Sequence, residues 1–362
     1  MKNFYLLIIF SLALFGCEKQ SGLVSAEKEI LLKNYRPESI YKIPRSKITK
    51  AKFPAIDIHS HAYARSLKEI DQWVNTMNKV GIERTVILTK KTGAEFDSLI
   101  NVYGKYPDKF ELWCGFDLSN FDDENSVQNA IKELERCAKA GAKGVGEISD
   151  KGKGLNYSDD PNKRIHLDDP RLKSLFDKCA ELNLPVNVHV ADPIWMYLKM
   201  DSTNDGMMNA VEWRLDNAPD IRSHAEMIRT LERVVSNHPK TIFIACHFAN
   251  LSYDLNTLGI LLDRYDNLYA DIAARYAETA PIPRFVSEFY NKYQDKIVYG
   301  TDMGFDEEMY HVTFRILESS DEHFYEINQF NYHWALNGLA LNDKILKKVY
   351  RENAVKILNS VK

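Results

Sequence analysis

The sequence predicts an α/β fold in which eight parallel strands close into a (β/α)8 barrel, or TIM barrel. Short β-rich runs alternate with amphipathic helical patterns eight times along the chain. The length of 362 residues suits one large barrel better than two ordinary domains. No glycine-rich phosphate-binding loop follows the first strand, which disfavours an open doubly wound sheet.

The predicted strands are short and β-rich, and they cover Ala55–His59, Thr85–Leu88, Glu111–Phe116, Lys143–Ile148, Pro185–Val190, Thr241–Phe248, Leu268–Ile272 and Lys296–Thr301. Between them, apolar residues recur at helical spacing in Leu67–Val80, Ser126–Lys139, Arg171–Leu182, His224–Asn237 and Ile282–Tyr293. A last amphipathic segment, Asn342–Leu358, should pack on the barrel wall.

Two connections are long: residues 149–170 after the fourth strand and 191–223 after the fifth. Because both follow strands, both should lie at the C-terminal face, where barrel enzymes carry their active sites. The second loop contains Trp195, Tyr197 and Trp213. We expect one or two of these rings to reach the site and the rest to form a small satellite core.

The N-terminus predicts export. Lys2 precedes an apolar run from Phe4 to Phe15 that is too short for a comfortable membrane span, so residues 1–16 are expected to be a signal peptide. The run ends Leu14-Phe15-Gly16-Cys17, which resembles the lipobox of bacterial lipoproteins. We therefore expect lipidation at Cys17, a tether and strap over residues 17–50, and the barrel over residues 51–362. The protein would be a membrane-anchored lipoprotein of the bacterial cell envelope.

The composition narrows the classes of partner that we expect the protein to bind. The net charge of −4 gives no general attraction to nucleic acid. Cys114, Cys137, Cys179 and Cys246 lie in apolar strand-like or helix-like runs, which favours buried free thiols over disulfides. A small-molecule substrate is the expected partner, and a homo-oligomer is left open.

The first strand carries two histidines at strand spacing. It reads Ile56-Asp57-Ile58-His59-Ser60-His61, and residues two apart on a strand face the same side. Both imidazoles should therefore point toward the barrel axis, where two neutral rings can bind one divalent ion. Alone, this pattern also fits a pair of structural histidines.

Further ionisable residues end other predicted strands at the face where barrels place catalytic groups: Glu147, His189, His247 and Asp302. Burying this many polar groups is costly unless a cation or a dense network satisfies them. The set favours a metal centre over a purely structural network.

This combination resembles the amidohydrolase superfamily, whose motifs are a first-strand His-x-His, histidines on strands five and six, and an aspartate on strand eight. Residues 225–250 and the run Val349-Tyr350-Arg351-Glu352-Asn353-Ala354 are similar to the amidohydrolase-related group that includes aminocarboxymuconate semialdehyde decarboxylase. The resemblance covers about residues 53–360.

The resemblance implies that His59, His61, His189 and Asp302 hold a divalent metal. It implies that His247 handles protons near the metal-bound water, and that Asp302 also accepts a proton from it. Three nitrogen ligands and one carboxylate suit Zn²⁺, and Mn²⁺ or Fe²⁺ also fit.

Glu147 decides whether the centre is expected to hold one ion or two. In two-metal members of the superfamily, a fourth-strand carboxylate bridges the ions, and the segment Gly144–Ile148 looks like that version. His189 and His247 would then hold the second ion. The alternative is that Glu147 pairs with a basic residue such as Lys151.

Two weaker candidates concern the substrate. Arg275, after the seventh strand, would bind a substrate carboxylate, although a salt bridge within its loop is the more common use of such a residue. Asp192 would orient His189 or meet the substrate.

The sequence favours a metal-dependent hydrolase of a small-molecule amide, ester or lactone. The first alternative is a metal-dependent decarboxylase of a carboxylated small molecule, and the second is a lipid-anchored binding protein without turnover.

Overall fold

The computed structural model describes residues 30–118, 121, 123–218 and 220–359. The chain divides into two compact units, residues 1–36 and 37–362. In the first, the described residues contain a short 3-10 helix, η1 (Leu32–Asn34). The predicted signal peptide and Cys17 lie outside the described residues and stay predictions. No helix in the described part of the chain has the length and apolar character that a bilayer crossing requires.

The described residues of the second unit form eight strands in sequence order, and neighbours within each sheet run parallel. They are β1 (Ala55–Ser60), β2 (Ile82–Leu88), β3 (Phe110–Trp113), β4 (Val145–Asp150), β5 (Val186–Val190), β6 (Phe243–Ala245), β7 (Leu268–Asp271) and β8 (Ile297–Val298). They form two sheets, β1-β2-β3 and β4-β5-β6-β7-β8.

Backbone hydrogen bonds join the two sheets at both edges. Between β3 and β4, the Cys114 N–H donates to the carbonyl of Gly144 at 3.0 Å, and the Gly146 N–H donates to that of Cys114 at 2.8 Å. Between β8 and β1, the Ile58 N–H donates to the carbonyl of Tyr299 at 3.0 Å. The strands therefore close into the predicted barrel, because backbone hydrogen bonds between described residues join the two sheets at both edges.

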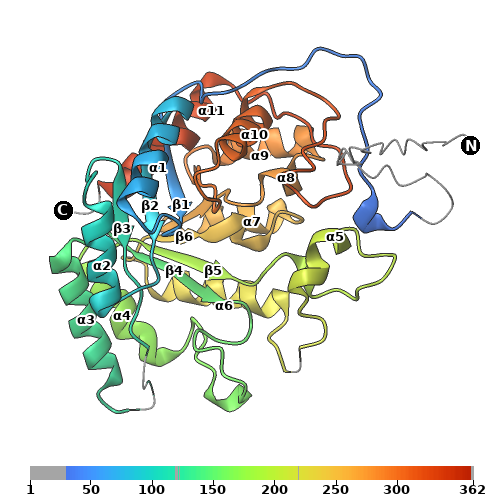
Figure 1. Cartoon of the computed structure of the whole chain (residues 1–362). Helices are drawn as coiled ribbons and strands as arrows, with labels where there is room; N and C mark the ends of the chain where they lie inside the picture. The colour runs from blue at the N-terminus through green and yellow to red at the C-terminus, as the bar shows by residue number, and fades with distance from the viewer. Residues whose placement is uncertain (1–29, 119–120, 122, 219, 360–362) are drawn as a thin grey trace, which may run out of the picture. The chain divides into compact units, whose positions relative to one another are not determined.

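The helices of this unit are α1 (Leu67–Val80), α2 (Gly93–Tyr103), α3 (Ser126–Ala140), α4 (Lys173–Glu181), α5 (Met207–Ala210), α6 (His224–Asn237), α7 (Leu255–Arg264), α8 (Tyr276–Thr279), α9 (Pro283–Tyr293), α10 (Glu307–Glu318), α11 (Asp343–Lys347) and α12 (Asn353–Leu358). Helices α1, α2, α3 and α6 lie outside the strands in Figure 1.

Two helices begin and end at the residues predicted, because local caps fix their boundaries. Ser66 accepts a hydrogen bond from the Glu69 N–H at the start of α1, and Gly81 ends it with φ +87°. Ser223 and Glu226 form a reciprocal capping box at the start of α6.

The predicted C-terminal segment packs against the barrel strands, in a break from the single helical pattern of Asn342–Leu358. A π-helical turn, η7 (Lys348–Glu352), lies between α11 and α12. The Tyr299 N–H after β8 donates to the carbonyl of Val349 at 2.9 Å. Ala354 and Ile357 pack with barrel residues such as Ile56 and Val298 in one buried cluster.

The predicted strands six and eight are too long. After β6, the chain turns into a left-handed segment, η6 (Cys246–Asn250), in which φ is between 52° and 60° from His247 to Asn250. L-residues seldom adopt this conformation consecutively, because it brings Cβ close to the following carbonyl. It turns His247 off the strand line and into the barrel mouth.

Candidate metal centre

His59 and His61 lie at the end of β1, and each has one ring nitrogen fixed by the protein. The Nδ1 atom of His59 lies 2.9 Å from Asp271 Oδ2 at the end of β7, and Nδ1 of His61 lies 2.8 Å from the carbonyl of Leu88. Both acceptors require a proton on Nδ1, so the Nε2 lone pairs are left for a ligand. The strand spacing predicted this shared face.

Asp302 follows β8 and forms a group of three candidate metal ligands with His59 and His61. Its Oδ1 atom lies 3.0 Å from His61 Nε2 and 3.5 Å from His59 Nε2. The Asp302 N–H donates to the carbonyl of His59 at 2.8 Å, which ties the carboxylate to β1. One donor atom from each of the three residues lies within 4.8 Å of the others.

The donor atoms of this group fit a divalent cation. Among the described residues, Nε2 of His59 is fully buried and has no hydrogen-bond partner. Burial alone lowers the pKa of His59, but the negative charges of Asp271 and Asp302 outweigh it and raise the pKa to about 9. Burial alone raises the pKa of Asp302, but His59 and His61 lower it. The pocket therefore favours positive charge at its centre.

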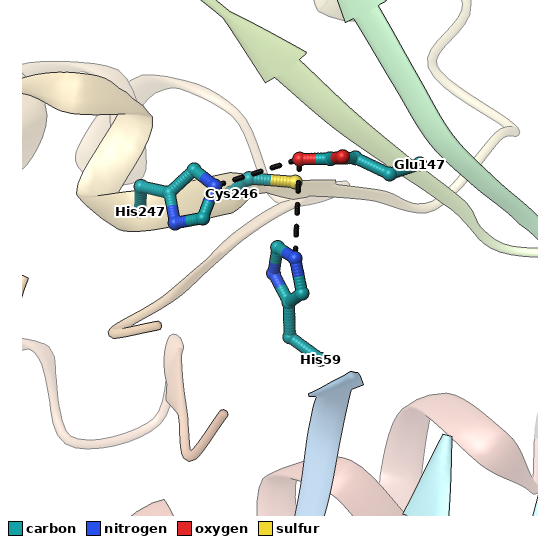
Figure 2. A group of neighbouring side chains, drawn as sticks. All are labelled: His59, Glu147, Cys246 and His247. Atoms are coloured by element: carbon teal, nitrogen blue, oxygen red, sulfur yellow. Dashed lines mark ion pairs between the residues drawn. The ribbon is translucent and has the colours of Figure 1, made fainter. Parts of the chain in front are cut away.

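Glu147 points toward His59 and His247 (Figure 2). Its Oε1 atom is 2.6 Å from His189 Nδ1, 3.4 Å from His247 Nε2 and 3.9 Å from His59 Nε2. Burial alone raises the pKa of Glu147, but its histidine neighbours lower it well below its usual range. Glu147 thus carries a negative charge at the centre of the predicted site.

His189 differs from the β1 pair because carboxylates hold both of its nitrogens. Nδ1 faces Glu147, and Nε2 lies 3.1 Å from Asp192 Oδ1. Asp192 thus makes the contact that its predicted orienting role needs, and it also lines the cavity described below. The metal-ligand role of His189 stays a prediction.

His247 presents Nε2 to the centre, because its Nδ1 lies 2.8 Å from the carbonyl of Ala273. Burial lowers its pKa to about 4 despite the hydrogen bond to Glu147. The ring is neutral at neutral pH, with a lone pair on Nε2 that faces Glu147 and Asp302.

A second group of candidate donors comprises His59, Glu147, Cys246 and His247 (Figure 2). The Cys246 thiol donates to Asn187 Oδ1 at 2.6 Å, and burial raises its pKa well above the usual range. A protonated thiol is a poor ligand. All four predicted free thiols are buried and unpaired by disulfides.

The basic partner of Glu147 is Lys90, not Lys151. Lys90 Nζ lies 2.5 Å from Glu147 Oε2, whereas Lys151 Nζ lies 3.0 Å from Asp192 Oδ2. Lys90 is not among the residues predicted for the site, although it lies two residues beyond the end of β2, at the same strand-end position as the other site residues.

A cavity of about 350 Å³ opens beside the centre. Its lining combines the long loops after β4 and β5, the segment after β7 and the segment after α10. The residues that contribute are Lys151, Met196, Trp213, Arg275, Phe330 and Tyr332. Trp213 therefore reaches the site, as predicted for one or two rings, while Trp195 packs against Trp334 at 5.8 Å between ring centroids.

Left-handed backbone marks the strand ends around this cavity. Lys90, Ala191, Ala274 and Asp302 have φ between 54° and 59°, in addition to the run that begins at His247. Non-glycine residues in this region carry strain that commonly clusters at functional sites. Here the left-handed backbone changes the direction in which the residues after these strands point.

Comparison with known proteins agrees with this geometry. The family model described as Amidohydrolase matches residues 56–359. The chain belongs to the amidohydrolase family. With its buried histidine and carboxylate cluster, it is a metal-dependent enzyme of that family. No curated protein sequence matches this amidohydrolase.

Several solved structures share its fold. An uncharacterised TIM-barrel protein from Bordetella bronchiseptica aligns with a TM-score of 0.56 and 14% identity over 85% of this chain and 99% of its own. The 2,6-dihydroxybenzoate decarboxylase from Rhizobium aligns with a TM-score of 0.51 and 16% identity over 85% and 99%. The IDCase of Metarhizium anisopliae gives 0.52 and 15% over 85% and 98%. These likenesses confirm the predicted TIM barrel.

Proposed function

We propose that this amidohydrolase is a metal-dependent decarboxylase of a small carboxylated molecule. The observation that carries the proposal is a buried guanidinium, Arg275, in the wall of the cavity that also contains Asp302 and His247. A cavity that holds both a predicted metal group and a fixed guanidinium suits a substrate with a carboxylate.

Arg275 is held in place with part of its donor capacity unused. Its Nε and Nη2 atoms donate to Asn250 Oδ1 at 3.0 and 2.7 Å, and Nη1 donates to the carbonyl of Ala274 at 3.1 Å. These are three of the five N–H groups of a guanidinium, so two are left for a ligand. Glu278 lies 3.6 Å from Nη1 and balances the charge. The predicted ion pair within the loop thus coexists with a place in the cavity wall.

The fold relatives support decarboxylation over the hydrolysis that the sequence favoured. One of the similar structures is a 2,6-dihydroxybenzoate decarboxylase. Its substrate combines a carboxylate with neighbouring oxygen atoms on a planar ring, and Trp213, Phe330 and Tyr332 give this cavity aromatic walls.

The chain's own residues divide the work of such a reaction. His59, His61 and Asp302 would hold a divalent ion, for which Zn²⁺ suits the donors, and the ion would supply Lewis-acid polarisation of substrate oxygen atoms. Arg275 would orient the carboxylate. When the C–C bond breaks, its electron pair stays on the substrate carbon, which must take up a proton. His247 would relay that proton: the lone pair on Nε2 would accept a proton from water and pass it to the carbon, while the Nδ1 proton stays bound to the carbonyl of Ala273.

Hydrolysis of an amide, ester or lactone is the second candidate, and the state of His247 favours it. With a pKa of about 4, the ring is neutral at neutral pH and is ready to accept a proton from an attacking water.

Product analysis separates the two reactions. Metal-loaded protein is incubated with a panel of hydroxybenzoates and other carboxylated rings, and in parallel with esters, amides and lactones. We expect CO₂ release from at least one carboxylated ring. Arg275→Gln should raise the KM for that substrate at least about tenfold, because a charge-assisted contact is lost. Bond hydrolysis without CO₂ release would contradict the proposal.

A further inference from the structure

We propose that Asp321 is a positioning residue that joins residues 39–46 of the strap to a hairpin in the wall of the substrate cavity. The hairpin, residues 324–336, begins and ends at an antiparallel bridge between Phe324 and Leu336. The proposal rests on the proposed function for the role of the cavity, but the contacts that carry it are the same whichever reaction occurs there.

The far part of the hairpin forms a wall of the cavity. The residues of the hairpin that line the cavity are Gln329, Phe330, Asn331 and Tyr332. Tyr332 stacks on Trp334 with 4.4 Å between ring centroids, and Trp334 Nε1 donates to the carbonyl of Ala277 at 3.1 Å. A planar substrate ring would pack against these aromatic side chains, so the position of the hairpin bears directly on substrate binding.

Backbone pairing within the hairpin is short. Phe324 and Leu336 exchange hydrogen bonds at 3.0 and 2.7 Å, and the bridge that they form is isolated. Beyond this bridge, the N–H groups of Gln329 and Phe330 donate to the carbonyl of Glu326 at 3.1 and 3.0 Å. Because a two-stranded hairpin is marginally stable by itself, contacts at its base are needed to fix its position.

Asp321 makes such contacts three residues before the hairpin. Its carboxylate accepts hydrogen bonds from the Ser46 N–H at 2.9 Å and from Ser46 Oγ at 2.8 Å. Arg315 of α10 donates to the same carboxylate from Nε at 2.8 Å. The Gly338 N–H, two residues after the hairpin, donates to the carbonyl of Asp321 at 2.7 Å. Asp321 therefore joins the strap and α10 to both ends of the hairpin.

A second set of contacts extends this link along the chain. Ser39 Oγ lies 3.2 Å from His323 Nδ1, and the Tyr41 ring meets the His323 ring edge-on with 4.8 Å between centroids. Arg315 also donates from Nη1 to Glu326 Oε1 at 2.9 Å, inside the hairpin. The strap thus contacts the base of the hairpin at two residues, and Arg315 carries the link into its first arm.

The charge of Asp321 strengthens the link. Burial alone raises the pKa of Asp321, but the hydrogen bonds from Ser46 and the Arg315 guanidinium lower it below its usual range. Hydrogen bonds to an ionised carboxylate are about twice as strong as neutral ones. Loss of this charge should loosen the hairpin and the cavity wall, whereas the candidate metal ligands at the strand ends keep their own contacts.

Hydrogen–deuterium exchange of the full chain tests the link without any substrate. Asp321→Asn keeps the side-chain shape and removes the charge. A strap variant, Tyr41→Ala with Ser46→Ala, alters the strap alone and leaves the Asp321 carboxylate in place. Glu318→Gln is the matched control: Glu318 also accepts a hydrogen bond from a backbone N–H, that of Lys52 at 2.9 Å, but it lies outside the hairpin.

We expect amide exchange at residues 328–334 to be at least about tenfold faster in Asp321→Asn and at least about threefold faster in the strap variant, with no change in Glu318→Gln. Affinity for Zn²⁺ should stay within about twofold of wild type in all three, because the substitutions are remote from the metal centre. Unchanged exchange at 328–334 in the strap variant, or an equal increase in Glu318→Gln, would overturn the proposal. The strap variant decides the outcome even where Asp321→Asn does not fold.

Kinetics tests whether the link serves substrate binding. For the carboxylated ring that releases CO₂, Asp321→Asn should raise KM at least about fivefold and leave kcat within about twofold, because the aromatic wall contacts the ground state and the transition state alike. An unchanged KM would overturn the positioning role. If no ring releases CO₂, the proposed function fails, and the exchange experiment by itself decides the link between strap and hairpin.

Discussion

The ends of β1 and β5 both carry histidines that point into the barrel mouth, yet their surroundings differ. At β1, Nδ1 of His59 meets Asp271, Nδ1 of His61 meets a backbone carbonyl, and both Nε2 atoms face the centre. At β5, both nitrogens of His189 meet carboxylates. The first arrangement leaves one nitrogen of each ring for a metal, which must displace a proton from His59, and the second holds both nitrogens of one ring.

This difference shows what a strand-end histidine pattern does and does not decide. The position on a strand sets the direction of the ring, but the neighbours of each nitrogen decide whether the ring can be a ligand. Substitutions at the ends of β1 and β5 therefore test whether the two histidine environments differ in metal binding.

Removing a β1 ligand should have the largest effect. We expect His59→Ala to lower metal affinity on the order of 1000-fold, because one of few ligands is lost. His189→Ala should lower it by only about tenfold, as expected for a residue that supports the site. Competition with a chromophoric chelator measures both affinities, and circular dichroism checks folding. Equal losses would show that His189 is a ligand of the same rank as His59.

Acidity should weaken metal binding strongly. The pKa of His59 without metal is about 9, so below that pH a proton occupies the ring and must be displaced by the ion. Affinity should therefore fall by about tenfold per pH unit from pH 9 to pH 7, about 100-fold in all.

Calorimetry in two buffers of different ionisation enthalpy should detect release of close to one proton per ion at pH 7.5. A flat affinity profile between pH 7 and pH 9 would show that His59 is already deprotonated in the free protein.

Substitution of the carboxylates that contact His59 and His189 should change metal affinity by smaller amounts than loss of His59. Asp271→Asn should lower metal affinity by about 10- to 100-fold, because Asp271 fixes the Nδ1 proton of His59. Asp192→Asn should change it by less than about threefold, because Asp192 contacts His189 on the side away from Glu147. The two substitutions keep side-chain shape and are measured side by side. The reverse order would place the metal nearer to β5.

Much of the fold was predictable because its patterns are local. The spacing of apolar residues predicted the exact bounds of α1 and α6, because a capping serine directly precedes each helix. Strand alternation placed His59 and His61 on one face. The strand boundaries were less predictable, because the left-handed turn at His247 depends on Asp271, whose side chain accepts the His247 N–H at 2.8 Å.

The sequence by itself determined the barrel, the strand ends that carry its chemistry and the family. Only the tertiary structure decided which groups meet there. Lys90 and Glu147 are 57 positions apart in the printed chain, and Asp271 pairs with His59 across 212 positions. Such pairs form because barrel closure brings the ends of all strands to one face. A pattern of neighbouring residues in the sequence does not tell which of these distant side chains meet. The pairing of Lys90 with Glu147 is therefore a property of the closed barrel.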